Sequence, residues 1–169
     1  MPALPQLTLI LGGQRSGKSA YAESLIGVGC KAIYLATGQA LDDEMSARII
    51  LHRARRGAHW TTLEEPLDII GALKGAEQPV LVDSMAMWVA NLLQAGRDVE
   101  AETLALVQAL ESIKSAVVIV SDEVGLGIIP ENPLARNFID ALGSANQKIA
   151  AQAARVVMIT AGLAQVLKG

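Results

Sequence analysis

The chain reads Gly12-Gly13-Gln14-Arg15-Ser16-Gly17-Lys18-Ser19 directly after the apolar run Leu7–Leu11. This stretch matches the phosphate-loop pattern G-x-x-x-x-G-K-[ST] at every fixed position. The glycines let the backbone curl so that successive N–H groups point at phosphate oxygens, and the helix that follows adds its positive end. Lys18 is expected to reach the β- and γ-phosphates, and the Ser19 hydroxyl to bind Mg²⁺. The sequence therefore predicts a binding loop for a nucleoside triphosphate.

The segments outside this loop alternate between buried strands and helices. The runs with the length and β-branched content of strands are continuously apolar, which is typical of parallel strands covered on both faces. Segments long enough for helices lie between them, and strand alternating with helix indicates a doubly wound, mostly parallel α/β sheet flanked by helices. We expect one P-loop NTPase domain over residues 1–169. The predicted strands are Leu7–Leu11, Ala32–Ala36, Pro79–Asp83, Ala116–Ser121 and Arg155–Thr160, and the predicted helices are 17–26, 40–56, 84–95, 99–114 and 133–154.

The amino-acid composition excludes several classes of function. The 169 residues carry a formal net charge of −3, which gives no general attraction to nucleic acid or to an anionic membrane. Hydrophobic residues make up 51% of the chain, yet no uninterrupted apolar run approaches the roughly 18 residues of a membrane-spanning helix. The single cysteine, Cys30, excludes an internal disulfide. These features predict a cytoplasmic protein without a membrane span or a nucleic-acid partner.

Two acidic positions are candidates for a second contribution to a Mg²⁺ site. Asp83 ends the run Pro79–Asp83, and Asp122 with Glu123 follows the run Ala116–Ser121. The carboxyl ends of parallel strands face the ligand, so either acid is suitably placed. Each could equally cap the next helix or turn, and spacing alone does not choose between them.

A histidine lies within a charged stripe of the predicted helix 40–56. Glu44, Arg48, His52 and Arg56 are four residues apart and therefore share one face. Neighbouring positive charge disfavours the imidazolium, and a neutral imidazole can attack phosphorus. The same pattern also fits a solvated helix face. His59 is expected in a turn before Trp60.

Several other residues could have either a structural or a ligand-binding role. Trp88 and Trp60 could be core anchors or could stack on a flat ligand. Cys30 is expected to be a small buried apolar residue. The loop from Gly125 to Pro130 follows a strand, so it could grip a substrate or could be a purely structural turn.

Taken together, these segments resemble the bifunctional adenosylcobinamide kinase/adenosylcobinamide-phosphate guanylyltransferase family of cobalamin biosynthesis. The match runs from about Leu7 to Lys168, and its most specific motifs are D-D-E-M-x-x-R-I with a following histidine and E-V-G-x-G-I-x-P. The elements that carry it are Gly12–Ser19, Tyr34–Gln39, Asp42–Ile49 with His52, Trp60 with Glu64, Val82–Ser84 with Trp88, Asn91–Leu93, Glu123–Pro130 and Asn146-Gln147.

The resemblance implies a RecA-like fold and two reactions. In the first, adenosylcobinamide is phosphorylated from ATP or GTP. In the second, GTP guanylylates an enzyme histidine, and the GMP then passes to adenosylcobinamide phosphate to give adenosyl-GDP-cobinamide. The family's nucleophile falls on His52, and Lys18 is the other expected catalytic residue. The resemblance favours Asp83 over Asp122 as the acid that binds Mg²⁺ with Ser19, and it implies a homo-oligomer, a trimer. Expected nucleotide contacts are Gly12, Gly13, Gln14, Arg15, Ser16, Gly17, Lys18, Ser19, Thr37, Gly38, Gln39, Arg53, Ala54, Arg55, Arg56, Glu64 and Asp83.

The chain departs from the family pattern at two positions. Asp122 stands where family members often have asparagine, and Leu51 stands where some relatives have a second histidine. Two other functions remain compatible with the phosphate loop. One is a small-molecule kinase without the transferase step, and the other is a RecA-like switch that moves a partner when it hydrolyses a nucleotide.

Overall fold

A computed structural model describes residues 4–27, 29–39 and 57–169. Its strands form one seven-stranded sheet in the order β3-β2-β4-β5-β1-β6-β7, parallel except for β7, which runs antiparallel to β6. Strand β1, which leads into the phosphate loop, lies between β5 and β6. The strands are β1 (Leu7–Gly12), β2 (Ala32–Ala36), β3 (Trp60–Glu64), β4 (Val80–Asp83), β5 (Val117–Asp122), β6 (Arg155–Thr160) and β7 (Leu163–Lys168).

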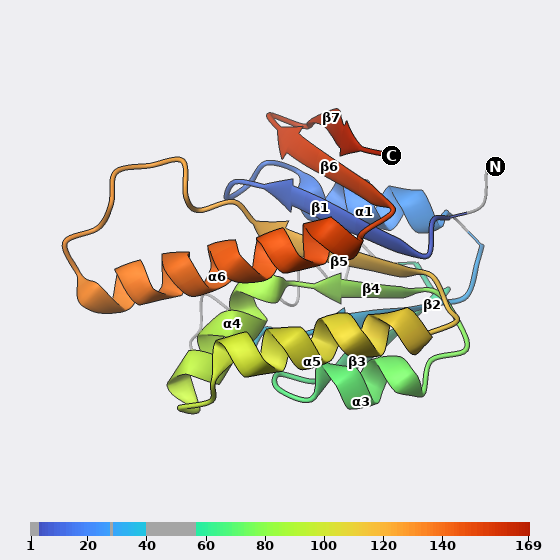
Figure 1. The fold of residues 1–169 in the computed structure, drawn as a ribbon. Helices are drawn as coiled ribbons and strands as arrows, with labels where there is room; N and C mark the ends of the chain where they lie inside the picture. The colour runs from blue at the N-terminus through green and yellow to red at the C-terminus, as the bar shows by residue number, and fades with distance from the viewer. Residues whose placement is uncertain (1–3, 28, 40–56) are drawn as a thin grey trace.

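Helices cover both faces of the sheet (Figure 1). Helix α1 (Lys18–Ile26) follows the phosphate loop and packs on one face, against β1, β4 and β5. The other face carries α4 (Met85–Gln94), α6 (Pro133–Gln152), α5 (Val99–Ser112) and α3 (Ile69–Lys74), with α5 in contact with the other three. The predicted mostly parallel α/β fold is therefore confirmed.

Strand β1 contributes side chains to the hydrophobic cores on both faces of the sheet. Its side chains alternate, so Leu9 and Leu11 belong to the apolar core under α3–α6, whereas Ile10 belongs to the core under α1. All three are buried because both faces are covered, which is why the sequence shows a continuous apolar run. Trp88 is completely buried, and its indole N–H donates to the carbonyl of Leu67 at 2.9 Å. It is thus a core anchor.

The five predicted strands agree with the structure to within one residue at each end. Three described elements were not predicted from the sequence. Strands β3 and β7 form the two edges of the sheet, and their residues are largely exposed, so neither shows a buried apolar run. Helix α3 has six residues, fewer than two turns. The predicted helix 40–56 lies outside the described residues.

Helix α6 begins at the predicted cap. The Asn132 side chain accepts hydrogen bonds from the N–H groups of Leu134 and Ala135, and Pro133 takes the first helical position. Leu142, Ala145 and Ile149 are buried as their spacing predicts, but Leu134 is 78% exposed, because the first turns of α6 extend beyond the sheet.

The prediction for Cys30 is wrong, since this residue is exposed between α1 and β2. A short turn on the surface offers no interior to bury it. Among the described residues, no helix is long and apolar enough to cross a membrane.

Candidate active site

The phosphate loop joins β1 to α1 in a tight turn. A Cβ atom on Gly12 would lie 2.5 Å from Ser16 Oγ and 2.7 Å from the carbonyl oxygen of Ile159, so only glycine fits there. Gly17 has a φ of 95° and caps α1 without a side-chain hydrogen bond. The first N–H groups of α1 therefore have no side-chain cap, which is the arrangement that binds phosphate oxygens at a helix start.

Lys18 is the first residue of α1 and is almost completely buried. Its Nζ atom lies 2.6 Å from Asp122 Oδ1, with side-chain exposures of 10% and 18%, and it also donates to the carbonyl of Gly13 at 3.2 Å. The end of β5 thus contacts the phosphate-loop lysine directly. Asp122 was the less favoured of the two acids in the sequence, but it is the one in direct contact with Lys18.

Asp83 ends β4, the strand next to β5. The Tyr34 hydroxyl donates to Asp83 Oδ2 at 2.6 Å. Leu81 and Val120 belong to the core under α1, and side chains two residues apart point to the same face, so Asp83 and Asp122 both project towards α1. Two carboxylates from neighbouring strands therefore face the phosphate loop from the same side of the sheet.

Thr37 follows β2 and is completely buried. Its hydroxyl donates to the Ser84 carbonyl at 2.7 Å and accepts from the Ser84 N–H at 2.9 Å. The Asn91 amide donates to the Thr37 carbonyl at 2.8 Å and to the Pro66 carbonyl at 3.0 Å. These bonds tie the ends of β2 and β4 together, so the Thr37 side chain braces the backbone around Asp83.

The expected contacts form two groups on the sheet. Gly12–Ser19 surround the end of β1, whereas Thr37 and Glu64 follow β2 and end β3. Four strand spacings separate β3 from β1, which amounts to about 19 Å. Glu64 is exposed at the far edge of the sheet, and Gly38 and Gln39, which follow Thr37 in the sequence, are half-buried. The structure thus does not bring Glu64 to the phosphate loop.

The structure describes some of the remaining expected nucleotide contacts but not all of them. Gln14 and Arg15 are exposed on the loop, Arg15 with a φ of 58°, and Ser19 is half-buried in the first turn of α1. His52, Arg53, Ala54, Arg55 and Arg56 lie outside the described residues.

Sequence reasoning named Tyr34, Asn91 and Asn146 only as parts of the family resemblance and did not predict that they position the two acids. Tyr34 binds Asp83, and the Asn146 amide donates to the Asp122 carbonyl at 3.1 Å while Asn146 Oδ1 accepts from the Ser121 hydroxyl at 2.6 Å. Asn146 and Asn91 are polar residues inside otherwise apolar helix faces, and both are buried. A buried polar residue on an apolar face requires a partner, and that was the available signal.

With this geometry in place, the comparisons with known proteins decide the family. The family described as cobinamide kinase/cobinamide phosphate guanyltransferase, CobU, matches residues 8–167. The chain belongs to this family. A bifunctional adenosylcobalamin biosynthesis protein CobP of Pseudomonas aeruginosa is 44% identical over 95% of this chain and 96% of the relative. CobU proteins of Salmonella typhimurium and Escherichia coli are 39% and 40% identical, over 96% of this chain and 99% of each relative.

Solved structures show the same fold at low sequence identity. An ATPase from a type III secretion system has a TM-score of 0.54 at 12% identity, and the P4 protein of bacteriophage phi6, in complex with ADP, has 0.50 at 14%. The chain spans about half of each, 51% and 58%, and these cover 93% and 98% of it. A Pyrococcus horikoshii protein has a TM-score of 0.55 at 11% identity, over 99% of this chain and 88% of that one.

The predicted family, the P-loop fold and the transferase class are thereby confirmed. The CobU family joins a kinase to a guanyltransferase, and the P-loop fold and the family together imply that this chain binds a nucleotide.

Proposed function

We propose that this CobU-family chain phosphorylates adenosylcobinamide with ATP or GTP and then transfers GMP from GTP, through a guanylylated His52, to adenosylcobinamide phosphate. The observation that carries the proposal is Lys18, held 2.6 Å from Asp122 at the first turn of α1, where the uncapped N–H groups of the phosphate loop also lie. Family membership over residues 8–167 supplies the substrate.

The kinase step takes place at the phosphate loop. Backbone N–H groups of Gly13–Ser19 and the Lys18 ammonium offset the charge of the β- and γ-phosphates. The substrate hydroxyl oxygen forms a bond to the γ-phosphorus, the bond to the β–γ bridging oxygen breaks, ADP or GDP leaves, and the hydroxyl proton is released. Lys18 must turn from Asp122 towards the phosphates for this step.

Ser19 and Asp83 are the proposed Mg²⁺ contacts. The Ser19 hydroxyl lies in the first turn of α1, and Asp83 projects towards the same helix from the end of β4. The described residues hold no cluster of three acidic, histidine or cysteine side chains, which suits an ion bound mainly by phosphate and water. When bound, Mg²⁺ supplies charge neutralisation on the phosphate oxygens.

The transferase step uses two displacements. A neutral imidazole nitrogen of His52 attacks the α-phosphorus of GTP, an N–P bond forms, and pyrophosphate leaves. A phosphate oxygen of adenosylcobinamide phosphate then attacks the same phosphorus, and the histidine leaves. Arg53, Arg55 and Arg56 are close to His52 in sequence and suit the phosphate oxygens. The expected contacts Thr37–Gln39, Ala54 and Glu64 belong to the proposed nucleotide site of this half-reaction.

The proposal includes one domain over residues 1–169, a cytoplasmic location and a homotrimer. The described strands form a single sheet. Its edge strand β7 exposes all six of its residues, including Leu163, Val166 and Leu167, and an exposed apolar edge strand favours association between copies.

The test is the intact mass of the protein after incubation with GTP and Mg²⁺ in the absence of corrinoid. The chain has two histidines, so His59→Ala is a matched control for His52→Ala. We expect a GMP adduct on the unaltered protein and on His59→Ala, lost in acid and stable in base, and none on His52→Ala. An adduct on His52→Ala would reject His52 as the nucleophile.

The kinase half is tested with ATP labelled at the γ-phosphate and adenosylcobinamide. We expect label transfer by the unaltered protein and by His52→Ala, but none by Lys18→Ala. A protein that binds GTP without forming an adduct, and that still transfers the label, would be a kinase alone and would refute the second half of the proposal.

A further inference from the structure

The loop between β5 and α6 exposes apolar side chains to an unusual degree. Leu126 is 82% exposed, Ile128 98% and Ile129 77%. Among the described residues, these belong to the most exposed large hydrophobic side chains. Leaving such side chains in water forgoes most of the free energy that their burial would supply. We call Leu126, Ile128 and Ile129, with the backbone that carries them, the apolar loop.

The apolar loop is held at both ends. Before it, Glu123 Oε1 accepts a hydrogen bond from the Gly125 N–H at 2.8 Å. After it, the Arg136 guanidinium donates to the carbonyls of Pro130 and Glu131, at 3.0 and 2.6 Å. The segment between is thus anchored to the start of α6 while its apolar side chains contact water. This arrangement presents a surface for a ligand.

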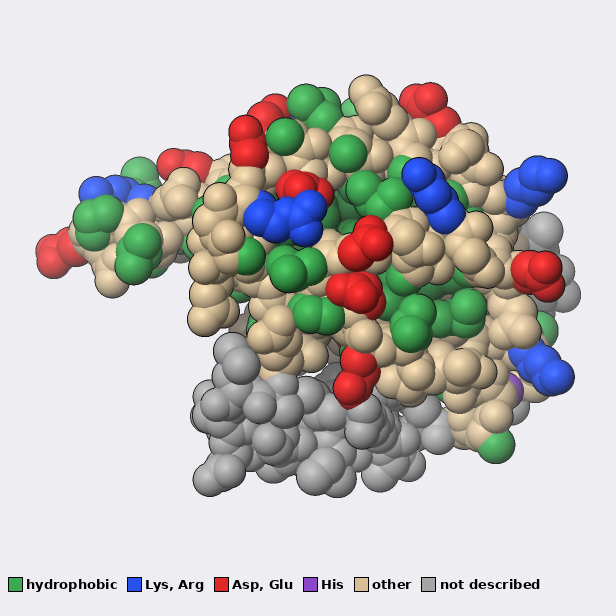
Figure 2. All heavy atoms as spheres, turned by 90° about the horizontal axis from the view of Figure 1, so that it is seen from below, with side chains coloured by type: hydrophobic (Ala, Val, Ile, Leu, Met, Phe, Trp, Pro, Cys, Tyr) green, Lys and Arg blue, Asp and Glu red, His purple; other side chains and the backbone are tan. Residues whose placement is uncertain are grey.

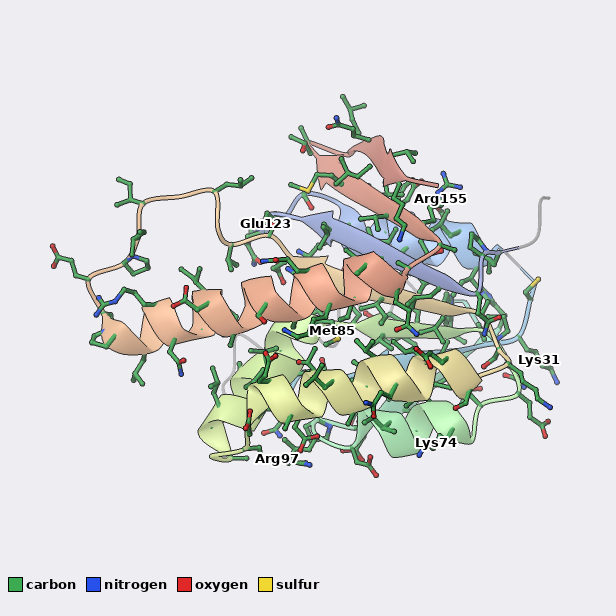
Figure 3. The ribbon with its side chains drawn as sticks, viewed as in Figure 1. Lys31, Lys74, Met85, Arg97, Glu123 and Arg155 are labelled. Carbon is green, nitrogen blue, oxygen red and sulfur yellow. The ribbon has the colours of Figure 1, made fainter. Side chains whose placement is uncertain are left out.

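The position of the loop links it to the phosphate site. Its first residue, Leu126, comes four residues after Asp122, the partner of Lys18, and the Glu123 N–H donates to the Gly12 carbonyl at 3.1 Å. Figure 1 shows the loop projecting past the carboxyl edge of the sheet, the edge at which the phosphate loop lies, and Figure 3 shows Glu123 at its base. Figure 2 shows the projecting end of the molecule from below, where apolar side chains lie beside acidic and basic ones.

Distance and charge point to the kind of ligand. Ile128 lies six positions after Asp122 in the chain, and six residue steps span at most about 20 Å when extended, so the apolar loop lies within reach of a large molecule that is bound at Lys18. Residues 124–130 contain no charged side chain, so the side chains that this segment offers to a ligand are apolar. A corrinoid has a broad apolar ring, which suits the apolar side chains of the loop. It must also bring its hydroxyl to the γ-phosphate, which requires that it bind within reach of Lys18.

On the basis of the function proposed above, we propose that the apolar loop binds the corrinoid ring of the acceptor, with Leu126 and Ile128 against its apolar face, while the phosphate loop holds the nucleotide. The loop then sets the affinity for the acceptor and leaves nucleotide binding unaffected. This division follows from the chemistry of the two surfaces: N–H groups and Lys18 on one side, uncharged apolar side chains on the other.

The experiment compares the double variant Leu126→Ser/Ile128→Ser with the conservative variant Ile128→Leu and with Leu104→Ser, which alters an exposed leucine on α5. Equilibrium dialysis measures the Kd of cobinamide from its visible absorbance. Intact mass after GTP treatment measures self-guanylylation, and light scattering measures the mass in solution. All altered side chains are exposed, so circular dichroism should show an unchanged fold.

We expect the Kd of cobinamide to rise about tenfold or more in the double variant, and to stay within about twofold in Ile128→Leu and Leu104→Ser. Self-guanylylation and molecular mass should not change. An unchanged Kd in the double variant would overturn the inference, and so would a lower molecular mass, which would identify the loop as a contact between copies. If the unaltered protein neither phosphorylates cobinamide nor forms the GMP adduct, the proposed function itself fails, and the two failures are thus distinguishable.

Discussion

Asp122 gives the phosphate-loop lysine of this chain an ionised partner. The family pattern often has asparagine at this position, which could accept a hydrogen bond from Lys18 but would carry no charge. Here the Lys18 ammonium and the Asp122 carboxylate are 2.6 Å apart and largely shielded from water. A triphosphate must separate them and must then lie near a carboxylate, and both effects oppose binding.

Replacing Asp122 by asparagine should therefore tighten nucleotide binding. We expect the Kd of ATP or GTP to fall about fivefold in Asp122→Asn, because Lys18 is released and one negative charge is removed. Calorimetric titration with and without Mg²⁺ measures this. Asp83→Asn is the control, and it should weaken binding only when Mg²⁺ is present. Weaker, Mg²⁺-dependent binding by Asp122→Asn would show instead that Asp122 contacts the metal.

Residue identities in the phosphate loop were predictable because each has a local reason. A Cβ atom on Gly12 would clash with Ser16, four residues further along the chain, and Gly17 has a positive φ. The pairing of Lys18 with Asp122, and of Tyr34 with Asp83, was not predictable from the sequence. These partners are far apart in the chain, and only the order of the strands brings them together.

Among the elements, α6 shows how a local signal starts a helix away from the core. Its first turn begins at Asn132 and is mostly exposed, so packing contributes little there and the cap contributes more. The same turn anchors the apolar loop through Arg136. The cap of α6 therefore supports both the helix and the proposed corrinoid surface.

Removing this cap should destabilise the protein measurably. We expect Asn132→Ala to lower the free energy of unfolding by about 1 kcal/mol in urea titrations, since the N–H groups of Leu134 and Ala135 lose their acceptor. Asn132→Asp, which keeps an acceptor, should retain most of the stability. An unchanged midpoint combined with faster amide exchange at 133–138 would contradict this expectation, because the first turns of α6 would then open independently of the core.

Elements with a buried face were predictable, and elements at the edges were not. Strands β1, β2, β4, β5 and β6 read as apolar runs because their residues are largely buried. Strand β3 has the residues WTTLE and β7 has LAQVLK, and each mixes polar with apolar side chains because one or both faces meet water. These segments form strands because their backbones pair with β2 and β6.

At the scale of the whole molecule, an ion pair connects two helices on the same face of the sheet. Lys148 on α6 lies 2.9 Å from Glu100 Oε1 on α5, and Ser144 donates to Glu100 Oε2 at 3.2 Å. The hydrogen bond from Lys148 is the main reason that the pKa of Glu100 lies below its ordinary value of 4.5. The carboxylate is exposed, so salt will weaken the pair.

This link should make stability depend on pH in a defined direction. A lowered pKa in the folded state means that the contribution of Glu100 is present above pH 4.5 and is lost as the pH falls through the lowered value. We expect the unaltered protein to have a slightly higher urea midpoint than Glu100→Gln at pH 7 in low salt. The difference should vanish as the pH falls well below 4.5 and also in high salt. A difference that persists in acid would show that the pair acts through packing and not through charge.

The phosphate loop, the five buried strands and the cap of α6 could be predicted because each depends on residues that are close together in the chain, and the family could be predicted because its motifs are read along the chain. The contact of Asp122 with Lys18, the four strand spacings of about 19 Å between β3, which ends at Glu64, and β1, and the exposure of the apolar loop became visible only in the folded chain. Strand order and burial result from the packing of the whole chain, and a local pattern does not carry them.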